Sequence, residues 1–388
     1  MNGFAPNDPV MPRMQTAPSP AAPPLAQASA TRGGRPGRLA DVDMRANGFD
    51  TIRLIAAIAV ILSHAFPLTG ATEPLEWASG GQITIGALAV SIFFLISGYL
   101  IPASLDRGSL ARYATKRAMR IMPALVAAVL VCVAALGPLV TKLSIGAYFG
   151  DPATWRFLGH AVFLPVGFDL PGVFTAQPLS AVNGSLWSLK YEVACYILVP
   201  IAFAFGALRR VVVVLGWLAS FAIAWAIPEG TGGVFYFLDL FAQLYRYFGT
   251  GMLLYLFADR IPLRRDWALW AVIACGFAIL TPFFAEAMAT LGAYAIVYFA
   301  YHCPQWFRDV TARGDISYGV YVYAFPIQQL FVPLSLGGIL GALAAPWAVN
   351  FLIALPLSLL AGLVSWVAIE KPFLLLGRSR RPVRPSLA

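Results

Sequence analysis

Long apolar runs, separated by short polar and basic segments, make up the chain after residue 46. A helix that crosses the ~30 Å hydrocarbon core of a bilayer needs about 20 predominantly apolar residues. We therefore predict an all-α fold, a polytopic transmembrane helical bundle of about ten spans. The expected spans are 50–68, 82–103, 121–140, 187–207, 211–227, 233–258, 267–283, 285–302, 316–335 and 347–369.

Composition agrees with a membrane protein, because 59% of the residues are hydrophobic and only 12% are charged. The net charge of +9 does not indicate nucleic-acid binding, since the basic residues gather between the apolar runs. Of the 27 Lys and Arg residues, 22 lie in the terminal segments and in 104–120, 208–210, 259–266 and 303–315. Lys and Arg favour cytoplasmic loops. We therefore expect a multi-pass protein of the plasma (inner) membrane with both termini in the cytoplasm.

The two ends of the chain differ from the apolar middle. Residues 1–46 are rich in Pro, Ala, Gly and Ser, and residues 374–388 are short and basic. Such segments lack the apolar residues that form a core. We expect a disordered cytoplasmic tail over 1–46, a transmembrane domain over 47–373 and a basic cytoplasmic tail over 374–388. The four cysteines do not have the spacing of metal ligands, so we expect no metal.

The first span carries Arg53 and His64 within an otherwise apolar sequence. Ionisable groups are costly in hydrocarbon, so they often mark a functional site. Their separation of eleven residues is three helical turns plus ~20°, which puts both on one helix face, ~16 Å apart along the axis. A second interpretation stays open, in which Arg53 reaches lipid head groups and His64 is satisfied in the core.

A basic segment precedes the third span. Lys116, Arg117 and Arg120 converge on one face of a helix that we expect to stop at Pro123. These side chains either anchor the helix to anionic lipid or bind phosphate, for which guanidinium groups are suited.

Other spans also contain polar residues. Ser97 and Gly98 favour close helix packing, and the Ser97 hydroxyl is also suited to a reactive site. Glu192 needs a partner or a function, and we expect His64 as that partner because both lie in the outer halves of their spans. The remaining candidates lie in the fourth and sixth spans: Trp187, Ser188, Tyr191, Asp239 and Arg246.

Six motifs in this order resemble those of the acyltransferase 3 family. The members of this family are integral membrane O-acyltransferases that modify cell-envelope glycans. The motifs are Arg53 with His64, FFLISGY (93–99), KRxxRxxP (116–123), WSLxxE (187–192), GDISYGVY (314–321) and EKPF (370–373). The resemblance extends from about residue 48 to 373. One departure is Ala324, at a position where many relatives carry a histidine.

The resemblance implies that the protein moves an acyl group, with acetyl the expected one, from cytoplasmic acyl-CoA to a hydroxyl of an envelope or exported glycan. It implies His64 as the catalytic residue and places Arg53, Arg117 and Arg120 on the donor side, where we add Lys116. Histidine is suited to act as general base.

The other roles follow from the chemistry of acyl transfer. A carboxylate such as Glu192 would stabilise the imidazolium. The oxyanion needs a donor such as Ser97, Trp187 or a tyrosine. Expected partners are acetyl-CoA, a glycan or lipid-linked saccharide and the bilayer, without nucleic acid. The alternative is a membrane transporter of a lipid-linked sugar or organic anion, because intramembrane charges would serve it equally well.

Overall fold

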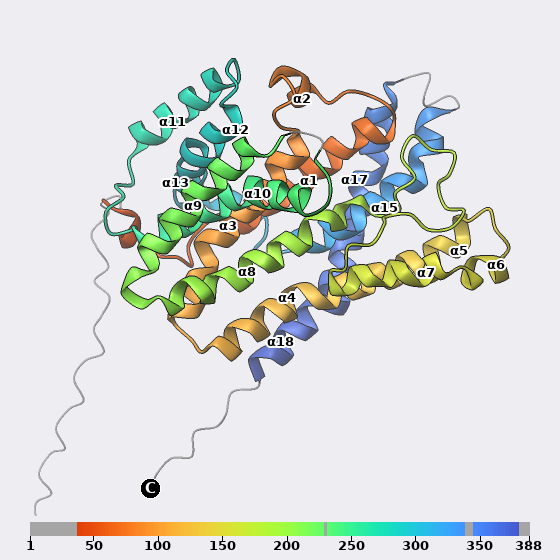
Figure 1. Ribbon diagram of the computed structural model, residues 1–388, viewed down its shortest axis with the longest axis horizontal. Coiled ribbons are helices and arrows are strands. Elements are labelled where there is room, and N and C mark those ends of the chain that lie inside the picture. The colour runs from red at the N-terminus through yellow and green to blue at the C-terminus, as the bar shows by residue number, and fades with distance from the viewer. Residues whose placement is uncertain (1–36, 229–230, 338–343, 380–388) are drawn as a thin grey trace, which may run out of the picture. The chain divides into compact units, whose positions relative to one another are not determined.

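The computed structural model describes residues 37–228, 231–337 and 344–379 (Figure 1). Over those residues the fold is all-α and has no strand beyond an isolated bridge between Arg38 and Pro262. The predicted transmembrane helical bundle is confirmed. Its longer helices are α1 (Phe49–Leu68), α3 (Ile85–Asp106), α4 (Leu110–Val131), α8 (Leu189–Ala204), α9 (Arg209–Ala226), α10 (Gly233–Leu256), α11 (Arg265–Ala278), α13 (Ala293–His302), α15 (Ser317–Leu336), α17 (Pro346–Ser365) and α18 (Lys371–Ser379).

Shorter elements connect these helices. The short α-helices are α2 (Pro74–Ala78), α5 (Gly137–Val140), α6 (Ile145–Gly150), α7 (Pro152–Arg156), α12 (Phe284–Ala287) and α14 (Gln305–Asp309). The π-helical turns are η2 (Cys132–Leu136), η6 (Met288–Gly292) and η7 (Trp366–Glu370). The 3₁₀ turns are η1 (Leu39–Asp41), η3 (Phe157–Val162), η4 (Gly184–Ser188) and η5 (Gly206–Leu208).

Eight segments of the described residues are long and apolar enough to cross a membrane. They are Phe49–Leu68, Ile85–Asp106, Leu110–Val140, Gly184–Ala204, Gly206–Ala226, Phe284–His302, Ser317–Leu336 and Pro346–Gly377. They correspond to eight of the ten expected spans. The expected span 233–258 is the single helix α10, whose 24 residues have the length to cross but include Asp239 and Arg246. At 267–283, α11 has only 14 residues and is too short to span.

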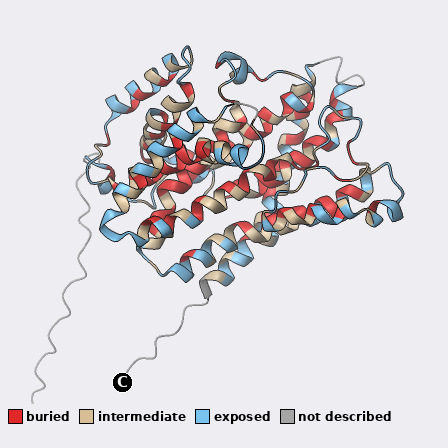
Figure 2. Cartoon of the chain, in the orientation of Figure 1, coloured by how far each residue is buried: buried red, intermediate tan, exposed pale blue. Residues whose placement is uncertain are grey.

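Burial distinguishes central from peripheral helices. In α3, 67% of the apolar stretch is buried, against 11% in the Gly206–Ala226 segment that contains α9. Figure 2 shows the same contrast between the buried inner helices and the exposed surface of α11. Large apolar side chains such as Leu215, Trp270 and Leu360 are exposed. These positions suit contact with lipid, where apolar side chains carry no hydration cost.

The basic segment and the third span form one helix. We expected Pro123 to end the segment, but α4 continues through it to Val131, so that expectation was wrong. A proline is tolerated inside a membrane helix when neighbouring groups satisfy the freed backbone carbonyl. Ser109 caps the start of the helix at Leu110, because its hydroxyl accepts a hydrogen bond from the Arg112 N–H at 3.3 Å. This cap places Lys116 in the second turn of the helix.

Helices α3 and α10 approach closely at two glycines. A Cβ atom added to Gly98 would lie 2.0 Å from the carbonyl oxygen of Phe248, and one added to Gly251 would lie 2.3 Å from that of Leu95. Both obstacles are backbone atoms, so a side-chain rotation cannot relieve either clash. Gly98 therefore has the packing role that is usual for small residues between membrane helices.

We expect Gly98→Ala to destabilise the protein by at least the ~1–3 kcal/mol typical of overpacking, because the α3 and α10 backbones must separate. The measurement is thermal unfolding of detergent-solubilised protein. Gly146→Ala is the matched control, since a Cβ atom there would meet no atom within 4 Å. Equal stability of the two variants would contradict the close approach of α3 and α10.

Both expected tails are shorter than the sequence suggested. Within the tail expected over 1–46, Leu39 is 2% exposed and its N–H donates to the carbonyl of Ile261 at 2.9 Å. Residues 37–46 therefore belong to the packed structure. At the other end, α18 continues the last helix to Ser379, into the tail expected over 374–388. Average composition does not register such short packed segments. The rest of both tails, 1–36 and 380–388, lies outside the described residues.

Candidate active site

The segments rich in Lys and Arg meet at one end of the bundle. Asp106, at the end of α3, accepts hydrogen bonds from Arg209 at 3.1 Å and from Tyr255 at 2.8 Å. Gly48, before α1, donates its N–H to the carbonyl of Ala300 at 2.8 Å. We call this the basic end. At the opposite end, Gln82 donates to the carbonyl of Thr281 at 2.8 Å.

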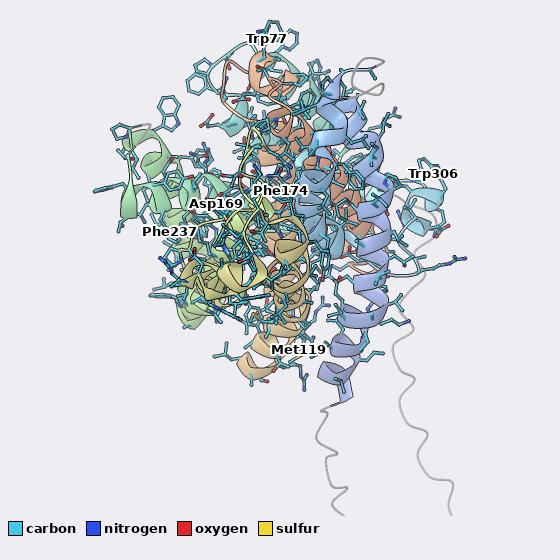
Figure 3. All side chains as sticks on the ribbon, turned by 90° about the vertical axis from the view of Figure 1, so that its right-hand side faces the viewer. Trp77, Met119, Asp169, Phe174, Phe237 and Trp306 are labelled. Atoms are coloured by element: carbon cyan, nitrogen blue, oxygen red, sulfur yellow. The ribbon has the colours of Figure 1, made fainter. Side chains whose placement is uncertain are left out.

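A cavity of about 1340 Å³, here called the main cavity, lies between α1, α3, α4, α8 and α15. Helix α18 packs beside α4 (Figure 1) and contributes Leu374, Leu375 and Gly377 to its wall. Figure 3 shows Met119 of α4 next to α18, and Met119 also lines the main cavity. Seven residues singled out from the sequence line the main cavity: Arg53, Ser97, Lys116, Arg117, Arg120, Ser188 and Glu192.

Two of these arginines are paired with carboxylates. Arg120 Nη2 lies 2.5 Å from Asp315 Oδ2, and its Nη1 lies 3.5 Å from Glu370 Oε2. Arg53 Nη1 lies 3.1 Å from Asp50 Oδ1 and 3.8 Å from Asp315 Oδ2. We call these five residues the arginine–carboxylate cluster. Burial by itself raises the pKa of Asp315, but Arg120 and Arg53 outweigh it, and the pKa lies below its usual value.

The turn η7 brings Glu370 to this cluster. Glu370 is 1% exposed and accepts a hydrogen bond from the Ser365 hydroxyl at 3.0 Å. A Cβ atom added to Gly319 would lie 3.0 Å from Glu370 Oε1, so the glycine leaves room for the carboxylate. A π-helical turn inserts one residue and redirects the side chains that follow it. We did not select Asp315 or Glu370 from the sequence, although both lie in the motifs GDISYGVY and EKPF.

Three further cations line the main cavity. Among the described residues, no ion pair includes Arg112, Lys116 or Arg117, all of which line the main cavity. The Arg117 guanidinium lies over the ring of Tyr196, 5.8 Å from its centroid, and its Nε is buried without a hydrogen-bond partner in the described part of the chain. These three side chains are available to an anionic ligand.

Glu192 faces the main cavity at the level of the arginines. Its carboxylate accepts a short hydrogen bond from the Tyr196 hydroxyl and interacts electrostatically with Arg53, Arg120 and Arg117. The pairing that we expected with His64 is absent from the described structure. The reason is depth, because η4 precedes α8 and Glu192 therefore lies nearer the basic end than its count along the span suggested.

His64 lies apart from the main cavity, whose lining among the described residues does not include it. Its ring meets Phe325 of α15 edge-on, with 5.0 Å between centroids. Its Nδ1 is buried and has no hydrogen-bond partner within the described ranges. Phe325 in turn packs on η4, because a Cβ atom added to Gly184 would lie 2.7 Å from its ring. His64 thus reaches η4 through Phe325.

The turn η4 separates two cavities. Ser188 lines the main cavity and shares a hydrogen bond of 2.7 Å with the Tyr321 hydroxyl. Trp187, its neighbour in the chain, lines a second cavity of about 270 Å³, together with Arg246.

Two further candidates from the sequence, Tyr191 and Asp239, lie outside both cavities as far as the chain is described. Tyr191 is buried and stacks on Phe237, 4.9 Å between centroids, and Asp239 accepts hydrogen bonds from Gln243 at 3.0 Å. The described residues also contain no cluster of three or more His, Cys, Asp or Glu suited to hold a metal ion.

Residues 46–369 match the family model described as an acyltransferase domain. The chain is 31% identical over 345 residues to the O-acetyl transferase of Shigella phage Sf6, which covers 85% of this chain and 96% of the relative. It is 27% identical over 376 residues to Nodulation protein 10 of Rhizobium leguminosarum bv. viciae, and this match covers 88% of this chain and 97% of the relative. O-acetyltransferase OatA of Staphylococcus aureus is 29% identical over 167 residues, covering 41% of this chain and 24% of that protein. No solved structure matches the chain.

Proposed function

The chain belongs to the acyltransferase 3 family, and from that premise we propose that it transfers an acyl group, acetyl in the first instance, from acyl-CoA to a hydroxyl of an envelope or exported saccharide. It is a multi-pass membrane protein and an acyltransferase. The proposal adds the donor, the acceptor class and the orientation. The basic end faces the cytoplasm of the plasma membrane, so both termini are cytoplasmic.

The observation that carries the proposal is the main cavity. Its lining includes Lys116 and Arg117, which form no ion pair with any described residue, together with Ser188 and Glu192. Guanidinium and ammonium groups suit the phosphates of CoA. A volume of about 1340 Å³ exceeds the ~300–1,000 Å³ of ordinary ligand pockets, which suits a ligand as long as acyl-CoA. Arg53 and Arg120, which already have carboxylate partners, support the walls of this site.

The reaction needs a base, an oxyanion donor and a leaving group. The saccharide hydroxyl attacks the thioester carbonyl and gives its proton to His64, which acts as general base. The hydroxyls of Ser188 and Tyr321 and the indole N–H of Trp187, all at or next to η4, are donors suited to the tetrahedral oxyanion. Collapse of the intermediate breaks the C–S bond, and the CoA thiolate takes the proton from His64. The two products, the acylated saccharide and free CoA, then leave the site.

Sealed membrane vesicles of known orientation test both the reaction and its direction. Inside-out vesicles expose the cytoplasmic face, so radiolabelled acetyl-CoA added outside should label their own lipid-linked saccharides. Right-side-out vesicles should not be labelled, because acetyl-CoA does not cross the bilayer. Equal labelling of both preparations would contradict the orientation. No labelling in either, together with saccharide movement that does not require acetyl-CoA, would favour the transporter instead.

A further inference from the structure

The second cavity is formed by parts of the chain that the proposed reaction does not otherwise use. It lies toward the end of the bundle opposite the basic end, because its lining includes Gln82, which bonds the carbonyl of Thr281. The other polar and aromatic side chains of the lining are Ser91 of α3, Trp187 of η4 and four residues of α10: Tyr236, Gln243, Arg246 and Tyr247. Its volume of about 270 Å³ equals roughly nine waters at ~30 Å³ each, room for one sugar ring.

Two planar polar groups in this lining are held in fixed positions. Gln243 Nε2 donates to both carboxylate oxygens of Asp239 at 3.0 Å. Arg246 is 6% exposed and its Nη1 lies 2.6 Å from Glu286 Oε1. The Nε of Arg246 has no hydrogen-bond partner among the described residues. A buried arginine that keeps donor capacity beside a cavity is suited to a polar ligand.

The aromatic residues supply the apolar half of the site. Trp187 packs edge-on against Tyr191, with 5.9 Å between centroids, which restrains its ring. The Tyr247 hydroxyl donates to the carbonyl of Ala285 at 3.1 Å, and Tyr236 is 54% exposed. A sugar ring has apolar C–H faces and hydroxyls around its edge. Aromatic rings combined with fixed amide and guanidinium groups complement both features.

We propose that the second cavity binds the sugar unit that receives the acyl group. This inference rests on the proposed function, because it names the acceptor side of the same site. The two cavities flank one turn, with Trp187 facing the second and Ser188 facing the main cavity. The charge of Arg246 is already balanced by Glu286, which favours a neutral sugar unit over a carboxylate or phosphate.

The first test separates the acceptor from the donor kinetically. Gln243→Ala should raise the apparent KM for the saccharide about tenfold, the effect of one lost hydrogen bond, and leave the KM for acetyl-CoA unchanged. Gln305→Ala is the matched control. Gln305 makes the same contact with an aspartate four residues away, Asp309 at 2.7 Å, but lies in α14 at the basic end. It should change neither KM. An unchanged saccharide KM in Gln243→Ala, or an equal rise in both KM values, would overturn the proposal.

The second test does not require catalysis. Ala285→Cys places a thiol in the wall of the second cavity, and the native cysteines, all buried, give the background labelling. Glucose, galactose, mannose and N-acetylglucosamine are the probes, with glycerol as the control solute. At least one sugar should slow maleimide labelling of Ala285→Cys, and none should slow that of Ala312→Cys, which is exposed near the basic end.

The outcomes of the second test distinguish the two proposals. Labelling that no sugar slows would overturn the acceptor site, even if acyl transfer occurs. Protection by a sugar in a protein that transfers no acyl group would refute the proposed function while leaving the sugar site in place.

Discussion

His64→Ala is expected to lower the rate of acyl transfer by about 10²–10⁴-fold, the typical contribution of a general base. The ring contacts Phe325 and lies apart from Arg117 and Lys116, which line the main cavity. The variant should therefore still bind acyl-CoA. Single-turnover transfer rates and direct acyl-CoA binding, measured on the same preparation, separate the two effects. A transfer rate equal to that of the wild type would remove His64 from the mechanism.

The other two histidines are the controls for this experiment. The ring of His302 stacks on that of Tyr298, with 4.1 Å between centroids, and its Nδ1 lies 2.9 Å from the Tyr298 carbonyl oxygen. These contacts are within one helix, so His302→Ala should keep most of the activity. The His160 ring packs on Phe168, and its Nε2 lies 3.0 Å from the carbonyl of Gly167. Burial lowers the pKa of His160 and so disfavours a charged ring. His160→Ala should reduce stability rather than the rate of transfer, and a loss of transfer at unchanged stability would contradict this assignment.

The sequence predicted the helices well because most apolar runs match the thickness of a bilayer. It failed at 267–283, where hydropathy continues but the helix ends at Ala278, shortly before Pro282. Averaging over a window does not register a single proline that removes a backbone donor. At Pro123 the error was the opposite one, because we expected a helix to end where α4 continues to Val131. Proline is tolerated inside a membrane helix when neighbouring groups satisfy the freed backbone carbonyl.

The composition of the site was more predictable than its pairings. The polar side chains of five elements face the main cavity, because a polar or charged side chain is costly in contact with lipid. Their partners depend on helix depth and rotation, which the sequence does not give. Asp315 lies 195 residues from Arg120 and meets it only through packing. The expected pairing of Glu192 with His64 failed for the same reason, since Glu192 lies nearer the basic end than its position along the span suggested. Its carboxylate accepts a hydrogen bond instead from Tyr196, four residues further along the same helix.

These pairings divide the cations of the main cavity into two groups. We expect Arg120→Ala to destabilise the protein by ~3–5 kcal/mol, the usual cost of removing one partner from a buried ion pair. Glu370, which is 1% exposed, would lose its ion-pair partner, and Asp315 would keep only the more distant Arg53, at 3.8 Å. Arg117→Ala breaks no ion pair of the described residues and should leave stability unchanged. It should instead weaken acyl-CoA binding by ~1–3 kcal/mol, the range for hydrogen bonds to charged groups.

The comparison needs unfolding and acyl-CoA binding measured on both variants. A double variant, Arg120→Ala with Asp315→Asn, should recover part of the lost stability, because one of the two carboxylates that lost Arg120 is then neutral. Such recovery is specific to an ion pair, since a lost phosphate contact would not respond to a change at Asp315. If Arg120→Ala unfolded like the wild type and lost only acyl-CoA binding, Arg120 would be a ligand of the donor. The arginine–carboxylate cluster would then be part of the donor-binding surface rather than its support.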